Sequence, residues 1–171
     1  AKPAVMDNCM YGNQLISQSI VMHYGNGIPM GKIERLFGDN VNSGSLFGIF
    51  HRLSNIMEPV IGKLIEEYRV SSVKHADETG WRNDGQVGYA WLFCNLLVSI
   101  YKFEDNRSSK VPESVFGTKK LPGVLVVDRY NAYNKAPCKL QYCYAHLLRT
   151  VNDLENEFDG NKEIQNFVDA F

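Results

Sequence analysis

Apolar residues in the first 70 positions recur at intervals of three and four, the period of an amphipathic helix. The spacing predicts three helices, which cover residues 13–24, 29–37 and 43–68. Pro59 lies inside the third and longest of them, so we expect a kink or a break just before that residue. This part of the chain therefore forms a helical segment, which we place at residues 1–70.

From residue 71 the pattern changes to short runs of β-forming and apolar residues. Strands are predicted at 70–74, 87–94, 96–103, 123–127 and 140–144, and helices at 108–115, just after 128, and at 145–158. Three antiparallel strands followed by parallel strands with crossover helices is the ribonuclease-H-like order. We therefore expect an α/β (α+β) fold class, a mixed ribonuclease-H-like sheet with flanking helices over residues 71–171, preceded by the helical segment.

The charge of the chain changes this picture only a little. Eighteen basic and 19 acidic side chains give a net charge of −1, which excludes a polybasic, histone-like protein. Residues 71–171 carry 12 basic and 13 acidic groups, so only a clustered basic face could bind DNA well. The apolar runs are too short to span a bilayer, so no membrane partner is expected. Four scattered cysteines favour reduced thiols and a cytoplasmic protein.

Two aspartates are the strongest candidates for chemistry. Asp77 and Asp128 each follow a predicted strand, where ligands gather in open α/β sheets. If the two strands are neighbours, the carboxylates converge and repel each other, and a divalent cation such as Mg²⁺ or Mn²⁺ relieves that repulsion. Two such ions can serve phosphodiester chemistry. The alternative is that Asp77 caps a turn and Asp128 caps a helix.

Four blocks of sequence point to a known family. They are His-Ala-Asp-Glu-Thr-Gly-Trp-Arg at 75–82, Gly-Val-Leu-Val-Val-Asp-Arg-Tyr-Asn-Ala-Tyr-Asn at 123–134, Tyr-Cys-Tyr-Ala-His-Leu-Leu-Arg at 142–149, and the helical segment Tyr11–Met30. In this order they resemble the motifs of insertion-sequence transposases of the IS sixty-six group. The resemblance implies a ribonuclease-H-like DDE transposase that uses Mg²⁺ or Mn²⁺, two ions in the complete enzyme.

The same resemblance assigns roles and partners. Asp77 and Asp128 match the first two acids of the catalytic triad, Asp77 bridging the two metals and Asp128 binding one. The DNA partners are the insertion-sequence ends and the target, the enzyme acts as a homo-oligomer assembled on DNA, and it is expected in a bacterial cytoplasm at the nucleoid. It would cleave the element ends with water and join the freed 3′-hydroxyl to the target.

The third acid of the family is a Glu on a helix well downstream, near an Asn-Asn-x-x-Glu-Arg type motif, which does not occur before Phe171. Glu155, Glu157 and Glu163 are carboxylates near the end of the chain, but solvated Glu residues are common on helix faces. We therefore expect a fragment of a longer protein that ends before this acid, and little or no strand cleavage by this chain alone.

Residues beside the two acids are candidates for DNA contact, because arginine binds phosphate and aromatic rings stack on bases. Packing in the sheet is the alternative for the aromatic ones. The predicted DNA-binding residues are Trp81, Arg82, Arg129, Tyr130, His146 and Arg149. His75 and Glu78 flank Asp77, and we expect strand alternation to point both away from its face.

Two further features leave alternatives open. Cys143 and His146 form a Cys-x-x-His pair that suits zinc, but a structural zinc site needs four ligands and the full set is not evident. The alternatives are that the pair braces the active site, that it contacts DNA, or that both residues are buried for structural reasons.

The helices around residues 29–52 fit either a helix-turn-helix or a helical bundle. Residues 1–70 carry only 6 basic against 6 acidic groups, which is few positive charges for a DNA-binding segment.

Two other functions fit the same residues. One is a ribonuclease-H-like nuclease that cuts without strand transfer, and the other is a non-catalytic DNA-binding or assembly protein. The transposase and the nuclease both need Asp77 and Asp128 to converge, and an assay for joining of DNA ends separates these two functions.

Overall fold

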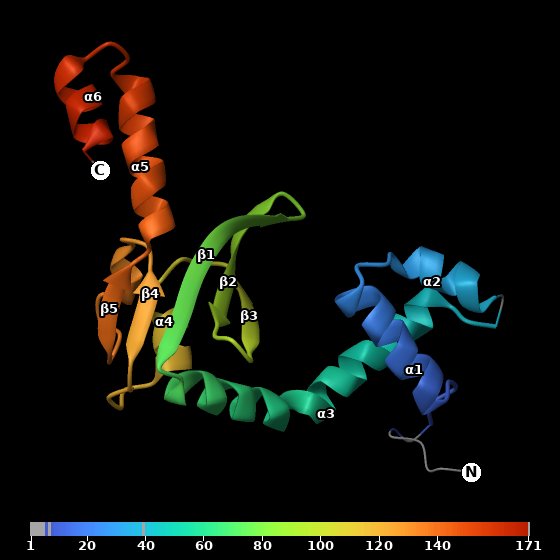
Figure 1. Ribbon diagram of the computed structural model, residues 1–171. Coiled ribbons are helices and arrows are strands. Elements are labelled where there is room, and N and C mark those ends of the chain that lie inside the picture. The colour runs from blue at the N-terminus through green and yellow to red at the C-terminus, as the bar shows by residue number, and fades with distance from the viewer. Residues whose placement is uncertain (1–5, 7, 39, 171) are drawn as a thin grey trace. The chain divides into compact units, whose positions relative to one another are not determined.

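A computed structural model describes residues 6, 8–38 and 40–170 of the chain. The fold divides into two compact units, residues 1–61 and 62–171, and each is described by itself (Figure 1). In the part of the chain described, no helix is both long and apolar enough to cross a membrane.

The N-terminal unit is a small helical assembly. Ile33 and Leu46 are fully buried at its centre, among mainly aliphatic neighbours. Asn42 ends the turn before the last helix, and its side chain accepts a hydrogen bond from the backbone N–H of Ser45 at 3.1 Å, as an N-cap does. The elements are α1 (Asn13–Ile20), the π-helical turn η1 (Val21–Gly25), α2 (Met30–Phe37) and the first part of α3 (Ser43–Val70).

Helix α3 runs from Ser43 to Val70 without interruption, through Pro59. The helix therefore does not break before Pro59, and the kink expected there as the alternative stays a prediction. Proline removes a single N–H donor from a helix and leaves the later turns able to form their own hydrogen bonds. The last turns of α3 belong to the second unit, where Tyr68 is fully buried and its hydroxyl donates to the His75 carbonyl at 3.2 Å.

The second unit is built on a five-stranded mixed sheet in the order β3-β2-β1-β4-β5 (Figure 1). Strands β1 to β3 are antiparallel, and β4 and β5 run parallel to β1. This is the ribonuclease-H-like arrangement that the order of elements predicts. The strands are β1 (Val73–Asn83), β2 (Gln86–Cys94), β3 (Ser99–Glu104), β4 (Val124–Val127) and β5 (Lys139–Tyr142).

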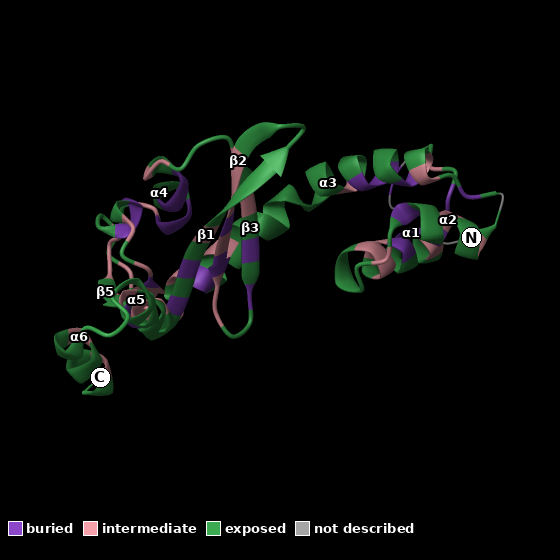
Figure 2. Ribbon diagram, turned by 90° about the horizontal axis from the view of Figure 1, so that it is seen from above, coloured by how far each residue is buried: buried purple, intermediate pink, exposed green. Residues whose placement is uncertain are grey.

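One face of this sheet carries the core. Trp91, Phe93, Leu125 and Val127 project from it and are fully or almost fully buried. Helix α4 (Lys110–Phe116), the short 3-10 turn η2 (Asn131–Tyr133) and the end of α3 pack on this face. The buried colouring in Figure 2 lies on the part of β1 and β2 away from their hairpin, whereas the end of the hairpin is exposed. We call the packed side the core face and the other side the open face.

The chain continues after β5 into two helices, α5 (Tyr144–Glu157) and α6 (Lys162–Asp169). They contact each other, and the side chain of Asn161 caps α6 by accepting from the backbone N–H groups of Glu163 and Ile164.

Strand β1 is longer than the sequence predicts. It continues past Asp77 to Asn83, where Asp84 and Gly85 take positive φ angles of 49° and 77° in the two-residue hairpin turn. The expectation that Asp77 ends its strand is therefore wrong. What ends near Asp77 is the pairing with β4, since the last paired residues are His75 and Val126.

Candidate functional site

The register of the sheet brings Asp77 and Asp128 together. In the parallel pair β1–β4, Val73 lies opposite Val124 and His75 opposite Val126. Continuing this register by two residues sets Asp77 beside Asp128, on strands that are spaced about 4.8 Å apart. Residues in register on neighbouring strands point to the same side of a sheet, so both carboxylates belong to the open face.

A single backbone N–H orients each of these carboxylates. The N–H of Glu78 donates to Oδ1 of Asp77 at 3.0 Å, and the N–H of Tyr130 donates to Oδ1 of Asp128 at 2.9 Å. Among the described residues neither carboxylate forms an ion pair. Two like charges side by side without a cation are the arrangement that a divalent metal stabilises.

Tyr133 provides a second indication that the acids converge. Its phenol has a pKa raised well above the usual value, first because it is buried, then because it hydrogen-bonds Glu78, and further because Glu78, Asp128 and Asp77 are negative. All three carboxylates therefore lie within electrostatic reach of one buried hydroxyl.

Glu78 lies on the core face, directly behind Asp77. Its side chain is 0% exposed, and both of its oxygens are used. Arg107 donates from Nε to Oε1 at 2.8 Å, and the Tyr133 hydroxyl donates to Oε2. The hydrogen bond to Glu78 raises the pKa of Arg107. Sequence reasoning did not single out Arg107, which lies in the loop between β3 and α4.

The expectation for the residues that flank Asp77 is correct for Glu78 and wrong for His75. Exposure along β1 alternates from Val73 onward, with His75 and Asp77 exposed and Lys74 and Ala76 buried. Residues two apart on a strand share a face, so His75 lies on the open face together with Asp77.

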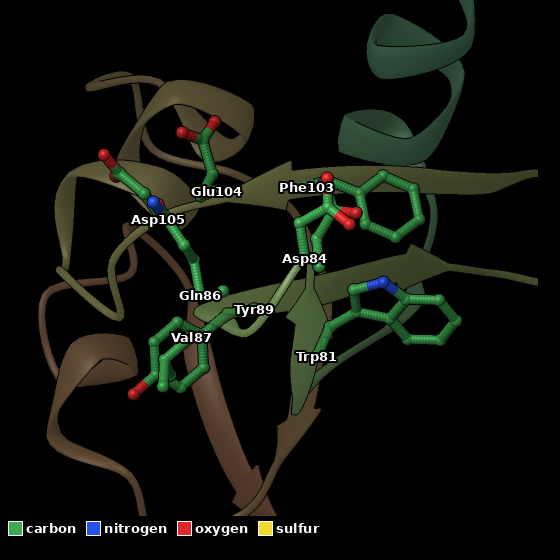
Figure 3. A pocket seen from close by; sticks show the side chains of 10 residues that line it. Trp81, Asp84, Gln86, Val87, Tyr89, Phe103, Glu104 and Asp105 are labelled. Carbon is green, nitrogen blue, oxygen red and sulfur yellow. The ribbon is translucent and has the colours of Figure 1, made fainter.

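Trp81 also lies on the open face, four residues beyond Asp77 and therefore about 13 Å along the strand. It is 55% exposed and meets Phe103 edge to face, with 6.1 Å between the ring centroids. Both rings line a pocket of about 510 Å³ at the end of the hairpin, which Figure 3 shows with Val87 and Tyr89. This concave surface is at the hairpin and does not include the two acids.

The other residues predicted to contact DNA come from β1, from the loop after β4 and from α5. Arg82 is exposed, and alternation places it on the side opposite Trp81. Arg129 is exposed beside Asp128, and Arg149 is exposed on α5. Tyr130 is half-buried and packs against the core, with the Arg107 guanidinium 3.9 Å from its ring centroid, so its environment fits the packing alternative.

Cys143 and His146 lie at the start of α5, next to the acids. The backbone N–H of Cys143 donates to the Val127 carbonyl at 2.7 Å, which places Cys143 beside the end of β4. The pKa of the Cys143 thiol is lowered, first by a hydrogen bond from the His146 side chain and then by backbone N–H groups. In the described part of the chain, no three His, Cys, Asp or Glu side chains are grouped so that they could hold a metal ion.

Comparison with known families assigns the chain. The transposase IS66 family matches it over residues 8–168, which is nearly its whole length. The chain belongs to the IS66 transposase family. The match covers all four sequence blocks on which the resemblance was based, and it makes this chain a DDE transposase, a polynucleotidyl transferase that acts in DNA transposition.

Other comparisons with the IS66 chain are weaker. No curated protein matches it. Among solved structures, the HTLV-2 integrase catalytic core in complex with magnesium is similar at 10% identity and a TM-score of 0.34, over 59% of this chain and 82% of that one. The simian T-cell lymphotropic virus intasome in complex with PP2A regulatory subunit B56 gamma matches at 8% identity and a TM-score of 0.33, over 89% and 66%. The assignment rests on the family match alone.

Proposed function

We propose that Asp77 and Asp128 form the metal-binding pair with which this transposase cleaves element ends and joins them to target DNA. The observation that carries the proposal is the β1–β4 register, which sets the two carboxylates side by side on the open face, where neither forms an ion pair with another described residue. Hard oxygen ligands of this kind favour Mg²⁺ or Mn²⁺. A bound divalent ion of this type activates an attacking oxygen and stabilises the leaving one.

The protein's own groups do the rest of the work in this proposal. Backbone N–H groups of Glu78 and Tyr130 hold one oxygen of each carboxylate, so that the second oxygen of each can face the metal. Arg129, next to Asp128 in sequence, and Arg149 on α5 supply positive charge at exposed positions, where phosphates of the DNA would lie. No protein nucleophile is needed, because water and the 3′-hydroxyl attack in turn.

Trp81 extends the proposed DNA surface along the open face. Its exposed ring is on the same side of β1 as Asp77, where an unpaired base near the cleaved end could stack on it. The DNA itself brings the protomers together in this proposal, as expected for a transposase that must hold two element ends.

Manganese binding and transposition together test the proposal. Electron paramagnetic resonance of free Mn²⁺ measures binding to the wild-type chain and to Asp77→Asn and Asp128→Asn. We expect each substitution to weaken binding at least 10-fold, and in a transposase that carries this chain together with the third acid to reduce transposition in a cell-based assay by about 1,000-fold, because each removes a ligand charge. Asp84→Asn, in the exposed hairpin turn, is the matched control and should change neither.

Unchanged Mn²⁺ binding and transposition in the two variants would contradict the proposal. A joining reaction with pre-cleaved element-end DNA separates a transposase from a nuclease, since only the former attaches the 3′ end to a second duplex.

A further inference from the structure

The two backbone hydrogen bonds to the acids come from residues that are themselves connected. Glu78 donates to Asp77 and Tyr130 donates to Asp128. Each of these donors is adjacent, or nearly adjacent, in sequence to the acid that it holds. Their side chains meet a third residue, Arg107, from a loop 29 residues from Glu78 and 23 from Tyr130 along the chain.

Arg107 uses a different part of its structure for each contact. The edge of its guanidinium donates to the Glu78 carboxylate, with 2.8 Å between Nε and Oε1. The face of the same group lies over the Tyr130 ring, 3.9 Å from its centroid. Its backbone carbonyl accepts the Tyr130 hydroxyl. A planar cation can form an edge contact and a face contact together, whereas an ammonium group cannot do both.

We propose that Arg107 is a positioning residue for the metal pair: by joining Glu78 to Tyr130 it fixes the two peptide groups that orient Asp77 and Asp128. The inference rests on the proposed function and deepens it, because it identifies what holds the two ligands in place. Arg107 itself need not touch metal or DNA.

Burial explains why this contact does more than pair two charges. The Glu78 side chain is fully buried, whereas that of Arg107 is 41% exposed, so the ion pair alone is partly screened by solvent and adds little stability. Without the Arg107 side chain, Glu78 keeps the Tyr133 hydroxyl as a partner and Tyr130 keeps its hydrogen bond to the backbone carbonyl of residue 107, but the direct connection of Glu78 to Tyr130 through the guanidinium is lost. The residues that follow β4 would then be held less firmly relative to Asp77.

The test compares Mn²⁺ affinity with the stability of the metal-free protein. Arg107→Met removes both contacts of the guanidinium, the one with the Glu78 carboxylate and the one with the Tyr130 ring. Arg107→Lys keeps the charge but loses the planar face. We expect Arg107→Met to weaken Mn²⁺ binding about 10-fold, within the range typical for residues that orient metal ligands, and Arg107→Lys to restore less than half of the loss on a logarithmic scale. Lys102→Met is the control, since Lys102 pairs with Ser114 and Glu104 away from the acids.

A double-mutant cycle adds a readout that a purely structural role would not move. Tyr130→Leu together with Arg107→Met should weaken Mn²⁺ binding no more than either change alone, because both break the same connection. Thermal unfolding without metal, monitored by circular dichroism, shows that each variant is folded. If Arg107→Met does not fold, Arg107→Lys and Tyr130→Leu carry the comparison.

The outcomes separate this inference from the function on which it rests. If wild type binds Mn²⁺ through Asp77 and Asp128 and folded Arg107 variants bind it equally well, the positioning role is wrong and the metal pair stands. If wild type binds Mn²⁺ no better than the Asp77→Asn and Asp128→Asn variants, the metal pair is wrong and the inference is overturned with it.

Discussion

Asp77 and Glu78 are consecutive acids on one strand, and the two faces of the sheet treat them in opposite ways. Asp77 is exposed on the open face and forms no ion pair among the described residues, whereas Glu78 is enclosed on the core face by Arg107 and Tyr133. The chemical groups are almost the same. What differs is whether protein donors have already used the oxygens, and only the carboxylate with a free oxygen can serve as a metal ligand.

The largest loss of stability is expected from a change just before β4, because the β1–β4 register depends on the backbone there. Gly123 has φ +70°, and a Cβ there would lie 2.0 Å from the Ser72 carbonyl oxygen, whose hydrogen bond from Val124 fixes the β1–β4 register. Gly123→Ala should therefore lower the free energy of unfolding by about 3 kcal/mol.

Urea denaturation checks this value. Gly160→Ala is the matched control, since Gly160 has φ +78° and nothing within 4 Å of the added carbon, so it should cost only about 1 kcal/mol. Equal losses in the two variants would show that the close approach to Ser72 is unimportant.

Replacing Glu78 and replacing Asp77 by the corresponding amide should change the stability of the fold by different amounts. Glu78→Gln replaces one of two buried accepting oxygens by an N–H2 group that faces a donor, either the Tyr133 hydroxyl or Arg107, so the free energy of unfolding should fall by about 1 kcal/mol. Asp77→Asn removes an exposed charge beside Asp128, and stability should change by less than about 0.5 kcal/mol.

Metal-free thermal and urea unfolding of the two variants measures the difference. A loss of stability in Asp77→Asn as large as that in Glu78→Gln would remove the contrast between the faces.

The smallest effect is expected on DNA affinity, where Trp81 and Arg82 allow the two faces to be compared at neighbouring positions of β1. Trp81→Ala should weaken binding of single-stranded element-end DNA about 10-fold through lost stacking. Arg82→Ala, on the opposite side of β1, should weaken it by a factor of about two and mainly reduce the salt dependence. Fluorescence anisotropy at two salt concentrations distinguishes them, and a greater loss with Arg82→Ala would place the DNA on the core side of the hairpin.

The order of elements and the end of β4 before Asp128 could be predicted from sequence, because both depend on local signals. Asp77 was expected at a strand end that the structure does not have, and the β1–β4 register is what sets it beside Asp128. Apolar runs such as Val124–Val127 end at a polar residue, and the parallel order of strands then brings such ends together. The extension of β1 to Asn83 was missed because Thr79–Asn83 has no buried alternation and is held in the sheet only by pairing with β2.

The contacts around Glu78 could not be predicted. Arg107 looks like any exposed basic residue in a polar loop, and only the folded chain shows that it meets Glu78 and Tyr130. The error for His75 is of another kind, since the two-residue period of a strand already assigns it to the face of Asp77.

The alternation of β1 also makes the number of residues before Asp77 as important as their identity. Inserting or deleting one residue between Val73 and Ala76 would move every later side chain to the other face, so that the shielded glutamate and the solvent-facing aspartate would exchange environments. Length changes in the hairpin turn at Asp84 and Gly85 leave this phase untouched. Variation in chain length should therefore be tolerated at the tip of the hairpin and excluded at its base.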